Sequence, residues 1–181
     1  VLVITFLLTV IFDLTVAIEV GIVLSAMLFM RRMAAVTNVG VISRELDDRV
    51  EPEEVGANSI QGKNIPKGVL IFEIDGPFFF GAASKFKDAI RFVGKTTDVL
   101  ILRLRKVPAI DSTGIATLED FYYDCKKRNT VLILSGLHAQ PMFACERAGL
   151  LDKIGEINIR GNIDDGLNRA REILGLPIEE I

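Results

Sequence analysis

The sequence of 181 residues lacks the residues on which several protein classes depend. It has no tryptophan, one histidine and two cysteines. Two cysteines exclude a disulfide-stapled scaffold, and one histidine leaves little material for a zinc site or a catalytic triad. With 24 acidic and 21 basic residues, the formal charge of −3 is not the basic balance of a nucleic-acid-binding protein. Half of the residues are hydrophobic, which excludes an intrinsically disordered chain.

The hydrophobic residues are concentrated at the start of the chain. The mean hydropathy is +0.38 although a quarter of the residues are charged. Between Val1 and Met30 only Asp13 and Glu19 are ionisable, so 43 of the 45 charged residues fall in the remaining 151 positions. The chain therefore consists of two unlike parts, a very apolar segment and a charged segment of ordinary single-domain size.

The apolar segment has three interpretations: a signal peptide, a core segment or a membrane-embedded helix. A signal peptide carries positive charge before its apolar run, whereas Arg31 and Arg32 follow this one. Asp13 divides the run, and its position predicts a cap for a second helix over Leu14–Met30, about 25 Å long. Short membrane helices in series are tolerated inside larger membrane proteins. We therefore expect this chain, which does not begin with Met, to be the tail of a longer membrane protein.

Charged residues around the apolar run indicate its sidedness. Arg31, Arg32 and Arg44 place the following part in the cytoplasm by the positive-inside rule. Glu19 is expected at the headgroup level or against missing helices rather than in a functional site within the membrane. Cys125 and Cys145 have no metal-binding or redox spacing and agree with a reducing compartment.

The charged segment alternates strand and helix patterns. Residues 33–66 are expected to form a connector with a short strand at Val39–Ile42 and an acidic run from Glu45 to Glu54. From residue 67 on, each of four predicted strands is followed by a predicted helix. These strands are Val69–Ile74, Val99–Leu104, Val131–Leu134 and Ile157–Ile159. The alternation predicts one α/β domain with a mostly parallel sheet over residues 67–181.

One polar turn is the best candidate for chemistry. Asp111, Ser112, Thr113 and Gly114 follow a predicted strand and open a predicted helix. The turn presents hydroxyl groups beside unpaired backbone amides, an arrangement that suits phosphate. A phosphate on Ser112 or Thr113 would add about −1.5 to −2 charges next to the positive end of the helix. Plain N-capping by Asp111 or Ser112 is the structural alternative.

Other chemistry has weaker support in the sequence. Ser112, Asp111 and His138 are the residue types of a catalytic triad, but the G-x-S-x-G elbow that such a serine usually occupies is missing. Nothing has the spacing of a metal site or of a nucleotide-binding loop, so Gly76 and Gly81 are predicted to lie in turns. Phe78–Phe80 is expected to be core, or an interface beside a membrane domain if part of it is exposed. We therefore predict neither an enzyme nor a cofactor.

Four segments in the right order resemble the STAS domain of SulP-type anion permeases. They are VLIFEIDGPFFFGAASKF, VLILRLRKVPAIDSTGIATLEDF, VLILSGL and ERAGLLDKIG. The preceding FDLTVAIEVGIVLSAMLFMRRM resembles the last membrane helix of the same family. The DSTG motif alone would be a weak match, whereas four consecutive matches attached to a membrane helix are specific.

The resemblance implies the C-terminal part of a secondary active transporter for sulfate or a related anion or dicarboxylate. Residues 1–32 would end the transmembrane domain of a multi-pass protein in the inner cell membrane, and 67–181 would be a cytoplasmic regulatory STAS domain. The implied partners are the lipid bilayer, the missing upstream helices that bind the anion, a second copy through the membrane domain, and a protein or nucleotide at the STAS domain. No nucleic acid is implied.

An alternative from another class is a soluble phospho-switch like the anti-sigma factor antagonists. In these antagonists the phosphoacceptor is the serine directly after the aspartate, which corresponds to Ser112. Residues 1–30 separate the two hypotheses, because a cytosolic switch has no reason to carry so apolar a segment.

Overall fold

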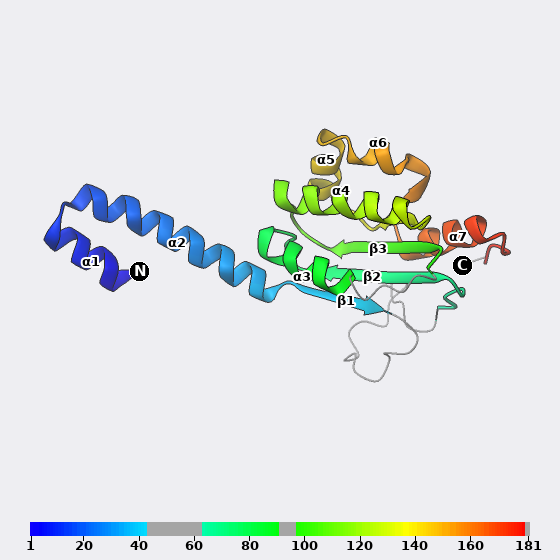
Figure 1. The fold of residues 1–181 in the computed structure, drawn as a ribbon, viewed down its shortest axis with the longest axis horizontal. Coiled ribbons are helices and arrows are strands. Elements are labelled where there is room, and N and C mark those ends of the chain that lie inside the picture. Colours follow the sequence, from blue (N-terminus) through cyan, green and yellow to red (C-terminus); the bar gives the residue numbers. More distant parts are fainter. Residues whose placement is uncertain (43–62, 91–96, 180–181) are drawn as a thin grey trace.

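The computed structural model describes residues 1–42, 63–90 and 97–179. Two helices lead into a layered sheet domain (Figure 1). The elements are α1 (Leu2–Ile11), α2 (Leu14–Val36), β1 (Asn38–Ile42), β2 (Val69–Asp75), α3 (Phe80–Ile90), β3 (Val99–Lys106), α4 (Ser112–Lys127), β4 (Val131–Ser135), α5 (Ala139–Arg147), α6 (Leu150–Ile154), the 3-10 turn Glu156–Asn158, β5 (Ile159–Arg160) and α7 (Ile163–Leu174).

Helix α2 begins at the predicted cap and is longer than expected. The Asp13 carboxylate accepts a hydrogen bond from the Leu14 amide at 2.6 Å, which confirms the cap. The helix has 23 residues and is about 34 Å long, against the 17 residues expected. It continues past Met30 because arginine, methionine and alanine are good helix formers. Its segment Leu14–Met33 is long and apolar enough to cross a membrane.

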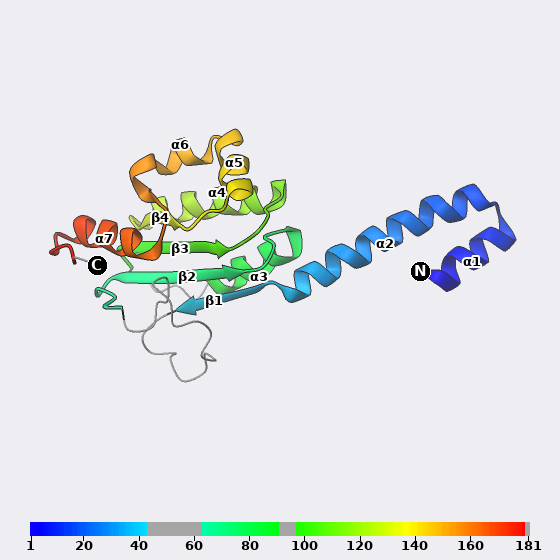
Figure 2. The ribbon, with the colours of Figure 1, turned by 180° about the vertical axis from the view of Figure 1, so that it is seen from behind.

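Helices α1 and α2 fold back on each other as a hairpin (Figures 1 and 2). Small residues allow the close approach: Ala17 is buried, and a Cβ on Gly21 would lie 2.7 Å from the Thr5 methyl group. Most of the large apolar side chains on the hairpin are exposed, and Glu19 is exposed as well. The hairpin thus presents an apolar surface of the kind that lipid or neighbouring helices cover.

The sheet has the order β1-β2-β3-β4-β5. Strands β2 to β5 are parallel and β1 runs antiparallel to β2, which confirms the predicted mostly parallel α/β domain. Strand β1 confirms the strand expected at Val39–Ile42 and adds an edge to the sheet from within residues 33–66. Arg44 and the acidic run Glu45–Glu54 lie outside the described residues, as does Gly94, at which the sequence predicts the end of a helix.

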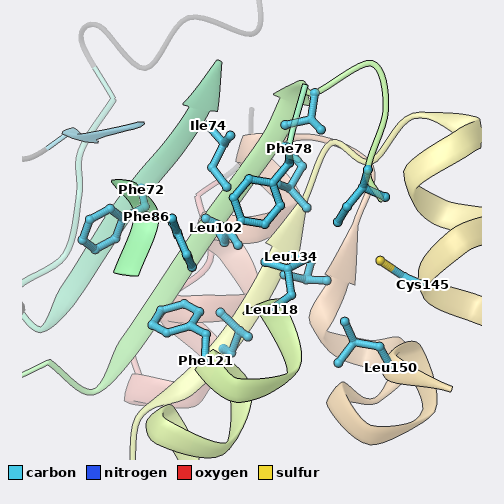
Figure 3. Close-up of a cluster of buried hydrophobic side chains, with 14 of the residues drawn as sticks. Phe72, Ile74, Phe78, Phe86, Leu102, Leu118, Phe121, Leu134, Cys145 and Leu150 are labelled. Carbon is cyan, nitrogen blue, oxygen red and sulfur yellow. The ribbon is translucent and has the colours of Figure 1, made fainter. Parts of the chain in front are cut away.

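Both faces of the sheet are buried, as the apolar strands predicted. On one face, Leu100, Leu102 and Leu104 pack against α3, α4, α5 and α6 (Figure 3). On the other face, Val99 and Ile101 pack against α7. Each fully buried side chain of this size stabilises the fold by roughly 1.5–3 kcal/mol. The sheet is therefore a rigid support for the loops at its edges.

Strand β3 also buries a charge that the sequence analysis did not anticipate. Arg103 donates to the Glu73 carboxylate on β2 at 2.7 Å, and the two side chains are 10% and 15% exposed. These residues are register partners on the neighbouring strands. A buried cation is tolerated here because its partner faces it across the ladder.

Several predicted boundaries are wrong by a few residues. Helix α3 begins at Phe80, so Gly81 lies in its first turn rather than in a loop. Helix α5 begins two residues before Pro141, which is tolerated because a first-turn amide has no partner within the helix. The last strand is Ile159–Arg160, because the 3-10 turn takes up the residues before it.

The phenylalanine run divides between core and surface. Phe78 is fully buried and stacks edge-on against Phe86 with ring centroids 5.5 Å apart. Phe79 is half-buried, whereas Phe80 is 63% exposed. The core assignment is therefore correct for Phe78 and wrong for Phe80.

Helix α2 joins the sheet domain with one intervening residue, Thr37. Thr37 is fully buried, and its hydroxyl lies 2.8 Å from the Pro77 carbonyl oxygen and 3.2 Å from that of Met33. The Lys85 ammonium on α3 donates to the Thr37 carbonyl at 2.9 Å and to the Ala35 carbonyl at 3.4 Å. The end of α2 is thus bonded to the domain from two sides.

We expect the two cysteines to resist alkylation in the folded chain. Burial raises the pKa of the Cys125 thiol to about 12 and that of Cys145 to about 11. Because the thiolate is the nucleophile, iodoacetamide at about pH 8 should leave both unmodified, and unfolding in guanidinium should make both reactive. Mass spectrometry counts the added groups. Equally fast modification of the folded and unfolded chains would contradict the burial.

A candidate regulatory turn at the amino end of helix α4

The turn Asp111–Gly114 lies where β3 passes into α4. The carboxyl ends of β2 and β3 point to the side of the domain on which α2 lies (Figure 1). Because α4 follows β3 directly, its amino end lies on this same side. The turn therefore lies at the carboxyl ends of the strands, on the side of the sheet nearest to the helical hairpin.

Asp111 is the cap of α4 and also contacts α3. Its Oδ1 accepts from the Gly114 amide at 2.7 Å, which confirms the capping alternative for this residue. Its Oδ2 accepts from the Phe80 amide at 3.4 Å, at the start of α3. One carboxylate thus joins the amino ends of two helices, where a negative charge is favourable.

Ser112 and Thr113 are exposed in the first turn of α4. The first amides of a helix have no partner within it, and they carry the positive end of the helix dipole. A phosphate on the Ser112 hydroxyl would lie at this end and add negative charge to an open surface without entering the core. The geometry is compatible with a phosphoacceptor, and the role itself stays a prediction.

Gly114 is buried and has no room for a side chain. A Cβ on Gly114 would lie 2.3 Å from the Phe78 carbonyl oxygen and 2.7 Å from Ile110 Cγ1. Neither contact can be relieved by rotating a flexible side chain end. The glycine of the motif therefore permits α4 to pack closely on the loop after β2.

Two residues that the sequence analysis did not place at the turn support it. The Gln140 side chain accepts from the Ile110 amide at 2.9 Å and donates to the Ile110 carbonyl at 3.1 Å. His138 Nε2 donates to the Arg105 carbonyl at 2.5 Å. Both residues follow β4, and no local pattern in the sequence indicates that Gln140 bonds to the loop after β3 or that His138 bonds to the end of β3.

The structure gives no support to a catalytic triad. Among the described residues, the hydrogen bond of the His138 ring goes from Nε2 to the Arg105 carbonyl oxygen, and none joins His138 to Ser112 or Asp111. Within residues 1–42, 63–90 and 97–179, no three His, Cys, Asp or Glu side chains are grouped in a way that would hold a metal ion.

Comparison with known families identifies the sheet domain. Residues 63–166 match the family model described as "STAS domain", which covers more than half of the chain. The chain therefore belongs to the STAS domain family, as its motifs and its sheet predicted.

A curated relative extends the match to the helical part. The chain is 31% identical over 153 residues to the Bacillus subtilis protein named "Putative sulfate transporter YvdB". The match covers 84% of this chain and 26% of that protein. The chain thus spans about a quarter of the length of this relative.

Solved structures agree with this assignment. A sulfate transporter family protein from Wolinella succinogenes is 39% identical, with a TM-score of 0.62, over 65% of this chain and 97% of that one. The murine anion transporter Slc26a9 has a TM-score of 0.65 over 94% of this chain and 28% of that one, at 21% identity. An anti-sigma factor antagonist from Mycobacterium paratuberculosis has a TM-score of 0.55 at 16% identity, over 75% of this chain and 94% of that one. These last two matches show a shared fold alone.

We expect Gly114→Ala to destabilise the domain. The new methyl group would overlap a backbone oxygen, and such overpacking costs about 1–3 kcal/mol of the free energy of unfolding. Gly161→Ala is the matched control, because no heavy atom lies within 4 Å of its Cβ position. Thermal unfolding followed by circular dichroism measures both. Equal melting temperatures for the two variants would contradict the close packing of α4.

Proposed function

We propose that this chain is the C-terminal part of a secondary active transporter for sulfate or a related anion or dicarboxylate. In this proposal residues 1–32, which hold α1 and most of α2, end a transmembrane domain in the inner cell membrane. Residues 33–66, which include the last turn of α2 and the edge strand β1, connect it to a cytoplasmic STAS domain over 67–181. The similarity to proteins named as sulfate transporters supports this assignment.

The observation that carries the proposal is the direct attachment of the STAS sheet to a helix of membrane-spanning length. Helix α2 ends at Val36 and β1 begins at Asn38. Only 6% of the apolar window within Leu14–Met33 is buried in the structure, whereas the core helix of a soluble domain is mostly buried. An exposed apolar helix of this length needs lipid or other helices around it. A multi-pass transport domain supplies both.

In this proposal the STAS domain regulates the transporter and performs no catalysis. Ser112 or Thr113 would accept a phosphate, and the added charge would change the surface seen by a protein or nucleotide partner. The anion would bind to upstream membrane helices. A second copy of the transporter would associate through the membrane domain.

The second candidate function is a phospho-switch of the anti-sigma factor antagonist kind. The shared fold and the exposed Ser112 favour it. The exposed apolar surface of α1 and α2 disfavours this second function, because such a switch acts in solution.

We expect the full-length parent protein to require detergent for extraction from cells. Fractionation should recover it with the membranes because of its apolar helices. In the same cells, uptake of labelled sulfate should depend on the full-length protein, and residues 1–181 alone should give none. Recovery in the soluble fraction without detergent would refute the transporter proposal.

We expect phosphate on the Asp111–Gly114 turn when the chain is incubated with cell extract and ATP. Ser112 is exposed at a helix end where added negative charge is favourable. Phosphopeptide mass spectrometry locates the group, and Ser112→Ala with Thr113 intact shows which hydroxyl accepts it. Ser84, exposed on α3, is an internal control that should stay unmodified. Absence of phosphate from both Ser112 and Thr113 would count against the switch.

A further inference from the structure

The junction between α2 and the STAS domain leaves little freedom of movement. Lys85 on α3 donates to two carbonyl groups at the end of α2, and Thr37 is buried against Pro77. A cation beside the last carbonyl groups of a helix also interacts favourably with its dipole. Helix α3 is therefore held beside the last turn of α2.

This arrangement determines where the amino end of α3 lies relative to the end of the apolar segment of α2. Phe80 precedes Lys85 by five residues, about 7 Å along a helix. The apolar segment of α2 ends at Met33, about 3–6 Å before the carbonyl groups that Lys85 contacts. The carboxyl end of β2, from which α3 follows, points to the α2 side (Figure 1). Phe80 therefore lies near the level at which the apolar part of α2 ends.

Phe80 is exposed at this position although its backbone is fixed. Its amide donates to Asp111, while 63% of the residue is open to solvent. Among the described large apolar residues of the STAS domain, it is the most exposed. Val36, in the last turn of α2, is 60% exposed as well. Exposed apolar side chains thus occur past Met33, both at the end of α2 and at the start of α3.

Cations accompany this apolar surface. Arg31 and Arg32 are exposed on α2. At the carboxyl end of β3, the Lys106 side chain is 46% exposed and lies 3.4 Å from the Asp75 carboxylate. Exposed aromatic rings beside arginine and lysine are typical of surfaces at the boundary between acyl chains and anionic headgroups.

We propose that the amino end of α3, held by Lys85, rests on the cytoplasmic leaflet and that Phe80 inserts between phospholipid headgroups. The STAS domain then has a membrane contact of its own beside α2. This contact lies next to the Asp111–Gly114 turn, because the Asp111 carboxylate accepts from the Phe80 amide of α3 and from the Gly114 amide of α4. The inference rests on the proposal that α2 crosses the bilayer.

Single tryptophans test this contact, because the chain has no tryptophan of its own. The chain of residues 1–181 is reconstituted in vesicles of phosphatidylcholine and phosphatidylglycerol whose acyl chains carry bromine near the headgroup end. Phe80→Trp should lose emission relative to vesicles without bromine, and its spectrum should shift to the blue. Circular dichroism checks that each variant is folded.

Two further variants separate the possible outcomes. Phe29→Trp, at a 61% exposed position on α2, should be quenched if α2 lies in the bilayer. Tyr123→Trp, at a 43% exposed position far along α4, should not be quenched. If Phe29→Trp is quenched and Phe80→Trp behaves like Tyr123→Trp, the membrane contact is refuted while the transporter proposal stands. If Phe29→Trp is not quenched either, both proposals fail.

Lys85→Gln tests what holds the contact in place. Combined with Phe80→Trp, it should reduce the quenching, because the ammonium group no longer holds α3 beside α2. Lys87→Gln is the matched control, since Lys87 is exposed on the same helix and pairs with Asp120 of α4 at 3.0 Å. Equal quenching in the two lysine variants would overturn the role assigned to Lys85.

Discussion

The carbonyl groups at the end of α2 are bonded by the sheet domain, and the orientation of the domain depends on these bonds. Lys85 contacts two of them, and the buried Thr37 hydroxyl contacts a third. Gly76 permits this approach, because at φ +107° it adopts a conformation that favours glycine and a Cβ would lie 3.1 Å from Thr37 Cα. Together with the single residue between α2 and β1, these bonds join the end of the helix to the sheet.

The direction of the strands then decides which loops lie on the side of α2. Strand β1 follows α2 and runs away from it. Because β2 pairs antiparallel with β1, and β3 and β4 are parallel to β2, the carboxyl ends of β2 to β4 lie on the side where α2 ends. In parallel α/β sheets the loops at this edge carry the functional groups. The Asp111–Gly114 turn is one of them. A charge placed on Ser112 would thus arise on the side of the sheet to which α2 is joined, which under the proposed function is the side of the transport domain.

Most of the fold could be predicted from the sequence, but only part of the junction between α2 and the sheet domain. Periodicity predicted the alternating elements, and Asp13 predicted the start of α2. These signals are local. The contacts of Thr37 and Lys85 join residues 40 and 48 positions apart, and an isolated threonine or lysine carries no pattern that reveals such a partner. At the turn, the Asp111 cap was predictable, whereas the support from Gln140 arises only when neighbouring parallel strands bring their loops together.

The central claim is that α2 crosses the bilayer with the STAS domain on its cytoplasmic side. Labelling of introduced cysteines with a membrane-impermeant maleimide in intact cells tests it directly, measured against the unsubstituted parent, since both thiols of residues 1–181 are buried. The full-length parent should react at Phe12→Cys, in the connection between α1 and α2, from outside the cell. Tyr123→Cys should react only after the membrane is opened. Reaction of both positions in intact cells, or of neither until the membrane is opened, would contradict the account.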